Sequence, residues 1–195
     1  MTHTTSYLDV FQYVNSKTTH SVGKIKYLIE NDDLSASDEL YRFLNEIEDI
    51  FRRNQLSEFT AIATYRIELL ASRWALDQRI PQKRFQLDKA SALIPNITKT
   101  VSNALKPIEN KINTARKIIQ ELVCMAYDSN MIHYQEKINF ADFSNGLWTL
   151  FLTHDSFKEK ATLVSKSLSK NDIIILISEE IHQKEKISPS EKSLF

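Results

Sequence analysis

The feature that most constrains this fold is an unbroken repeat of apolar residues over residues 101–126. Eight apolar side chains follow one another at alternating steps of four and three residues, and mostly polar residues stand between them. This spacing places the eight side chains along one narrow seam of an α-helix. Because such a seam needs neighbouring helices along its length, the pattern predicts a long central helix in a helical protein. The seam consists of Val101, Leu105, Ile108, Ile112, Ala115, Ile119, Leu122 and Ala126.

Glycine is scarce in this chain, which has two glycines and four prolines among 195 residues. Sheets and tight hairpins normally require glycine-containing turns, so we expect an all-α protein. The length is sufficient for one hydrophobic core. We therefore predict an irregular multi-helix bundle of about six to eight helices, forming a single domain over residues 1–183, with residues 184–195 as a flexible tail.

Two prolines define the expected limits of the central helix. Pro95 suits its first position, where the missing N–H group is not needed, so the helix is expected to span about residues 95–127. Pro107 falls inside that span, where it removes one hydrogen bond and crowds the preceding turn. We therefore expect a kink or a break near residues 105–106, and the continuous seam favours the kink.

A second amphipathic stretch, over residues 56–80, provides the expected partner for the seam. Its apolar residues follow the same helical spacing and are expected to be buried against the central helix: Phe59, Ala63, Ile67, Leu70 and Trp74. Residues 173–177 are five consecutive apolar residues and fit either a buried strand or a helix. The repeat of Ile173, Ile177 and Ile181 favours the helix.

The charge balance limits the classes of partner. The chain has 25 basic and 25 acidic residues, which argues against a dedicated nucleic-acid binder. No apolar run approaches the roughly 20 residues of a membrane span. A single cysteine and a polar first segment without a signal peptide indicate a cytoplasmic protein. The abundance of Lys, Ile and Asn relative to Arg, Ala and Gly suggests an AT-rich bacterial or phage genome.

Motifs for chemistry are absent or incomplete in the sequence. Too few glycines are present for a phosphate-binding loop or a nucleophile elbow, and one cysteine cannot build a thiolate zinc site. Glu179 and His182 have the Glu-x-x-His spacing of di-iron helical bundles, but a second copy is missing. Cys124 is interpreted as a buried structural thiol rather than a nucleophile. We therefore predict no catalytic, cofactor-binding or metal-binding residue.

Two groups of residues are candidates for binding surfaces. Residues 61–127 carry eleven basic and five acidic side chains, and part of this excess forms a possible basic patch of Arg66, Arg73, Arg79, Lys83 and Arg84. Aromatic residues concentrate in residues 131–157. They are interpreted first as core residues and, where exposed, as a possible interface of Tyr134, Phe140, Phe143, Trp148 and Phe151.

These observations favour a non-enzymatic helical module for protein–protein interaction, such as an adaptor, a chaperone-like protein or an accessory subunit of a larger cytoplasmic complex. The expected partner is another protein, and a homo-oligomer is possible. One alternative is a small-ligand binder or enzyme with a pocket near Cys124, His133 and Trp148. A second alternative is a nucleic-acid binder that uses the basic residues of the region 61–117.

Overall fold

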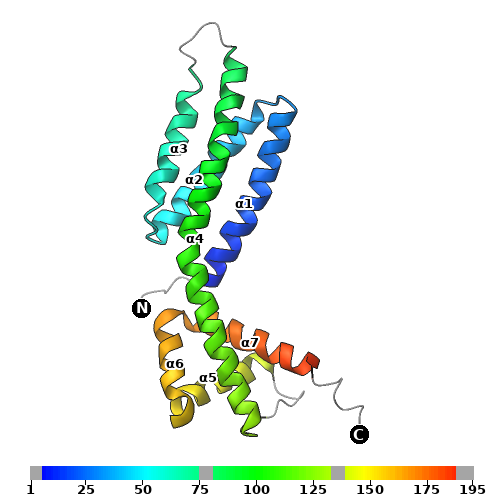
Figure 1. Cartoon of the computed structure of the whole chain (residues 1–195), viewed down its shortest axis with the longest axis vertical. Coiled ribbons are helices and arrows are strands. Elements are labelled where there is room, and N and C mark those ends of the chain that lie inside the picture. Colours follow the sequence, from blue (N-terminus) through cyan, green and yellow to red (C-terminus); the bar gives the residue numbers. More distant parts are fainter. Residues whose placement is uncertain (1–5, 75–80, 133–138, 188–195) are drawn as a thin grey trace. The chain divides into compact units, whose positions relative to one another are not determined.

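The computed structural model describes residues 6–74, 81–132 and 139–187, and in these ranges the chain forms seven α-helices and no strand (Figure 1). The helices are α1 (Tyr7–Glu30), α2 (Ser35–Arg53), α3 (Phe59–Ala71), α4 (Gln82–Asp128), α5 (Phe140–Thr153), α6 (Asp155–Ser167) and α7 (Lys170–Ile187). The predicted all-α architecture with one long helix is confirmed. Residues 173–177 are helical, within α7.

The chain divides into two compact units. We call residues 9–108 the N-terminal unit and residues 1–8 together with 109–195 the C-terminal unit. Where a single domain was expected over residues 1–183, the structure has two compact units. Their boundary inside α4 falls between Ile108 and Glu109, where no change of composition indicates a linker. Helix α7 continues through Ile187, into the segment expected to be a tail.

Helix α4 is the most extended element, with 47 residues. All eight seam residues are buried, as the spacing predicted. The helix starts at Gln82, so the prediction that Pro95 is its first residue is wrong, and it runs through Pro107 without the break considered above. The physical reason is that the buried stripe begins earlier: Leu87, Ala90, Leu93, Ile94 and Ile97 continue the seam towards the N-terminus across Pro95. Their burial compensates for the hydrogen bond that Pro95 cannot make.

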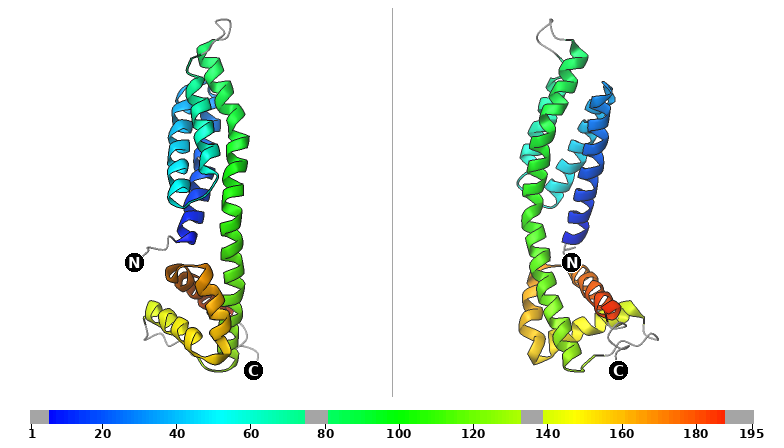
Figure 2. Two further views of the ribbon diagram at one scale, coloured as in Figure 1. Left: turned by 90° about the vertical axis from the view of Figure 1, so that its left-hand side faces the viewer. Right: turned by 45° about the vertical axis from the view of Figure 1, so that its right-hand side comes forward.

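The N-terminal unit consists of α1, α2, α3 and the first part of α4, which run alongside one another (Figures 1 and 2). Helix α2 supplies much of its core, with Leu40, Phe43, Leu44, Ile47 and Phe51 almost inaccessible to solvent. Ion pairs join neighbouring helices around this core. Lys17 and Lys24 of α1 pair with Glu46 and Glu39 of α2, at 2.7 and 3.1 Å.

The C-terminal unit consists of α5, α6, α7 and the last part of α4. Its core contains Trp148, Phe151, Phe157, Leu176 and Ile177. The rings of Phe151 and Phe157 meet edge to face, with centroids 5.3 Å apart. Arg116 of α4 pairs with Glu179 of α7 at 2.9 Å, and Lys160 of α6 pairs with Glu121 of α4 at 2.6 Å.

Candidate protein interface

Helix α3 is rotated relative to the prediction. The sequence pattern placed Ile67 and Trp74 in the core, but they are 61% and 71% exposed. The residues that α3 buries are Ile62 and Leu69. The prediction that Ile67 and Trp74 are buried against α4 is therefore wrong, whereas Phe59, Ala63 and Leu70 are half-buried.

The charged residues of α3 agree with this rotation. Arg66 and Glu68 are the only charged residues of the helix, and they lie on either side of the buried face. The Arg66 Nε atom donates to Glu48 of α2 at 2.8 Å, and Lys89 of α4 donates to Glu68 at 2.6 Å. In the rotation observed, both pairs form and Ile62 and Leu69 face inwards. Tyr65, on the same inward side, makes a 3.2 Å hydrogen bond with Thr100 of α4.

The opposite side of α3, which we call the α3 face, is free of charge. It contains the exposed residues Thr60, Thr64, Ile67, Ala71 and Trp74, bordered by the half-buried Ala63 and Leu70. Surface helices of globular proteins normally present charged residues on the side away from the core. Because α3 has apolar residues on both sides and only the inner side is packed within the described chain, the α3 face resembles a binding surface rather than ordinary solvated surface.

The two threonines of the α3 face satisfy their hydroxyl groups within the chain. Thr60 donates to the carbonyl of Ser57 at 3.1 Å, and Thr64 donates to the carbonyl of Thr60 at 3.0 Å. A surface that covers these residues would therefore not have to provide partners for their hydroxyls. This lowers the cost of burying the α3 face.

Trp74 lies just beyond the last residue of α3. The chain continues there in a tight turn, in which the Trp74 N–H donates to the carbonyl of Ala71 at 3.2 Å. The Trp74 side chain is exposed at this turn. The apolar spacing identifies Ile67 and Trp74 but predicts that they are core residues. Counting the charges on the two sides of α3 would have shown that one face has none.

The predicted basic patch is divided among ion pairs. Arg66 pairs with Glu48, Arg73 pairs with Asp38 at 2.8 Å, and Arg84 pairs with Asp88 at 3.1 Å. The hydrogen bond to Glu48 raises the pKa of Arg66 above its usual value. The guanidinium groups of Arg66 and Arg73 also lie over the ring of Tyr41. Lys83 is exposed, and Arg79 lies outside the described residues.

The predicted aromatic interface lies partly in the core. Trp148 and Phe151 are buried, which agrees with their interpretation as core residues, and Phe140 and Phe143 are half-buried. The Phe140 ring meets His182 edge to face at 4.3 Å between centroids. Tyr134 lies outside the described residues. These side chains therefore do not form one exposed patch in the described structure.

The residues considered for chemistry have other contacts. Glu179 pairs with Arg116, His182 Nδ1 lies 3.0 Å from the carbonyl of Ser178, and Cys124 is half-buried. Among the described residues, no group of three or more His, Cys, Asp or Glu could hold a metal ion. His133 lies outside those residues. A pocket of about 280 Å³ in the C-terminal unit includes neither Cys124 nor Trp148 and is lined by Ile132, Asp142, Phe143, Gly146, Leu147 and Leu150.

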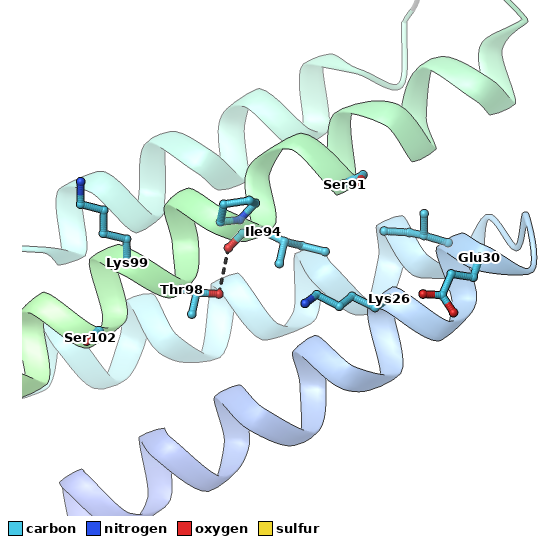
Figure 3. A pocket seen from close by; sticks show the side chains of 9 residues that line it. Lys26, Glu30, Ser91, Ile94, Thr98, Lys99 and Ser102 are labelled. Atoms are coloured by element: carbon cyan, nitrogen blue, oxygen red, sulfur yellow. Dashed lines mark hydrogen bonds between the residues drawn. The ribbon is translucent and has the colours of Figure 1, made fainter.

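A larger open pocket, of about 790 Å³, lies between α1 and α4 in the N-terminal unit (Figure 3). Lys26 and Glu30 project into it from α1, and Ile94 and Thr98 line it from α4. The Thr98 hydroxyl donates to the carbonyl of Ile94 at 2.9 Å. The lining combines two lysines, one glutamate, hydroxyls and aliphatic groups, without a buried acid or base for catalysis. Its full set is Lys26, Ile29, Glu30, Ser91, Ile94, Pro95, Thr98, Lys99 and Ser102.

Within the described residues, no helix is long and apolar enough to cross a lipid bilayer. Comparisons of the chain with protein-family models, with curated proteins and with solved structures found no match.

Proposed function

We propose that the protein is a helical protein–protein interaction module, of the adaptor or accessory-subunit kind, that binds its partner through the α3 face. The observation that carries this proposal is the exposure of Ile67 and Trp74 on a helix side without charge. We also propose that the protein acts in the cytoplasm, because its single cysteine cannot form an internal disulfide.

The residue types of the α3 face support a helix as the partner. Tryptophan is enriched among residues that contribute most to binding, and burial of a large apolar side chain is worth about 1.5–3 kcal/mol. The small residues of the α3 face, Thr60, Ala63, Thr64 and Ala71, leave shallow spaces for side chains of an approaching helix. The apolar positions recur at helical spacing, as in helix-in-groove recognition.

The alternatives have less support. A nucleic-acid site needs cations that are available to phosphates, whereas Arg66, Arg73 and Arg84 are engaged with carboxylates. The pocket between α1 and α4 is large enough for a small ligand, but its lining has no convergent chemistry.

The proposal is tested by affinity capture from an extract of the source cell. Tagged wild-type protein should retain a stoichiometric partner, and the Ile67→Glu and Trp74→Glu variants should lose it, because each introduces a charge into the apolar contact. Circular dichroism should show unchanged helicity for both variants, because both side chains are exposed.

Leu163→Glu is the matched control. Leu163 is 52% exposed on α6, in the C-terminal unit, so this variant adds the same charge at a distant helix surface. It should retain the partner. Equal retention of the partner by all variants would overturn the assignment of the α3 face.

A further inference from the structure

We propose that the partner of the α3 face is the α3 face of a second copy of this chain, packed antiparallel about a two-fold axis at Ile67. This inference rests on the proposed function and deepens it, since it names the occupant of the surface. Two features of the α3 face support self-association. The face has no charged residue, and its large and small side chains follow one another in a favourable order.

The charge pattern permits the face to meet its own copy. In a two-fold symmetric dimer, the same patch of both subunits forms the interface, so a charged patch repels itself. The α3 face contains only Ala, Thr, Ile, Leu and Trp. The nearest charged residues of the helix, Arg66 and Glu68, are neutralised within the chain by Glu48 and Lys89. An uncharged face is electrostatically complementary to itself.

The order of side-chain sizes favours the antiparallel direction. Ile67 lies midway between Thr60 and Trp74 in the sequence. When two α3 helices pack antiparallel with Ile67 on the axis, Trp74 of each copy lies over Thr60 of the other. Leu70 then lies over Thr64, and Ala71 over Ala63. The large side chains Trp74 and Leu70 thus each meet a small one, which favours close packing, and Ile67 meets its own copy on the axis.

The length of α3 sets the strength of this contact. Thirteen helical residues extend over about 20 Å. One pair of helices of this length buries less area than the roughly 1,200 Å² or more of a stable interface. The dimer should therefore be weak and depend on protein concentration.

Charge substitution at the axis gives the first test, with molar mass measured by sedimentation equilibrium over a range of concentrations. Wild-type protein should shift from monomer to dimer. Ile67→Lys and Ile67→Glu should each weaken self-association at least tenfold, because each places two like charges together at the axis. An equimolar mixture of these two variants should recover the dimer. A mixture that stays monomeric would overturn the two-fold arrangement.

Cysteine cross-linking tests the direction, in full-length protein with the native thiol removed by Cys124→Ser. Ile67→Cys should form a disulfide-linked dimer with itself. Thr60→Cys is the exposed control: across the antiparallel pair its two copies lie about 21 Å apart, too far for a disulfide. Mixing Thr60→Cys with Trp74→Cys should yield the linked heterodimer. Self-linkage of Thr60→Cys would indicate parallel helices and overturn the antiparallel arrangement.

The two proposals can fail separately. Wild-type protein that remains monomeric at every concentration overturns self-association. If Ile67→Glu nevertheless loses a different captured protein, the α3 face still acts as an interface and the proposed function stands. If the variant changes neither result, both proposals fail.

Discussion

The carboxylate of Asp172 links α7 to the beginning of α1 within the C-terminal unit. It is fully buried and accepts hydrogen bonds from the Ser6 hydroxyl at 2.5 Å, the Tyr7 N–H at 3.0 Å and the Leu8 N–H at 3.4 Å. The first N–H groups of a helix have no partner within the helix, and they are usually capped by a neighbouring residue. Here the cap comes from a residue far along the chain, so it serves as a tertiary contact.

Replacing Asp172 by alanine should destabilise the protein by about 2 kcal/mol, because the substitution leaves two N–H groups without their charged acceptor. Urea denaturation followed by circular dichroism measures this loss. Asp142→Ala is the control, since Asp142 is an exposed first-turn acid of α5. It should cost much less. Equal effects of the two substitutions would show that Asp172 contributes only to the helix dipole.

A second buried carboxylate, Glu180 of α7, should make stability depend on pH. Burial raises the pKa of Glu180 above its usual 4.5, and the neighbouring Glu179 raises this pKa as well, whereas Arg116 and Lys184 lower it. The protonated form is thus favoured in the folded state. This contribution to stability is fully present below about pH 4.5 and is lost as pH rises through the pKa of the folded protein.

Glu180→Gln should therefore raise the midpoint of urea denaturation at pH 7 and leave it nearly unchanged at pH 4, where the carboxyl is already protonated. Glu179→Gln is the control: it removes a half-buried charge and its pair with Arg116, and should not stabilise. A gain from Glu180→Gln that is equally large at pH 4 would contradict the titration of Glu180 as its source.

Among the helices, α4 was well predicted and α3 was not. The apolar residues of α4 between 101 and 126 follow a single helical stripe, so the sequence identifies the buried side of the helix without ambiguity. In α3, two apolar phases compete: one through Ile62 and Leu69, the other through Ile67 and Trp74. Spacing alone cannot choose between them. The observed phase is the one in which Arg66 and Glu68 reach Glu48 and Lys89, which belong to other helices and could not be located from the sequence.

The prolines of α4 show the same limit. Pro95 was assigned to a helix start because local preference favours it there. The buried side chains on both sides of it outweigh that preference, because their packing stabilises a continuous helix by more than one missing hydrogen bond costs. The α3 face could not be recognised as a candidate binding surface for a related reason. An apolar stripe predicts that its residues are buried, but it does not indicate whether the same chain or a partner covers them.

Pro107→Ala should stabilise the protein by about 1–3 kcal/mol, because alanine restores the backbone donor and relieves crowding against the preceding turn. Pro107 is exposed, so the substitution creates no cavity. Thermal unfolding measures the change. Lys106→Ala, at the adjacent exposed position, is the control and should alter stability by less than about 0.5 kcal/mol. A loss of stability in Pro107→Ala would show that the chain requires a bend at this residue.

At the scale of the whole molecule, the division into two units is the feature that the sequence did not indicate. Domain boundaries usually fall in polar or glycine-rich linkers. Here the chain passes from one unit to the other within α4, between Ile108 and Glu109, and again within α1, between Leu8 and Asp9. Both crossings are helical, so composition gives no sign of them.

The N-terminal unit should fold without the rest of the chain. About 100 residues suffice for an independent core, and the most buried residues of α2 pack within the unit. A fragment of residues 9–108 should be helical by circular dichroism and unfold cooperatively. It keeps the α3 face, so it should self-associate as the full chain does, and Ile67→Glu should abolish this.

The complementary fragment, residues 109–195, is the informative contrast. It lacks Ser6, Tyr7 and Leu8, so Asp172 remains without the donors that satisfy its buried carboxylate. This fragment should unfold at a lower urea concentration than residues 9–108 and gain stability when a peptide of residues 1–12 is added. A fragment that is as stable without the peptide as with it would show that the beginning of α1 contributes nothing to the C-terminal unit. Its dependence on a segment so distant in sequence would explain why this unit could not be recognised from composition or spacing.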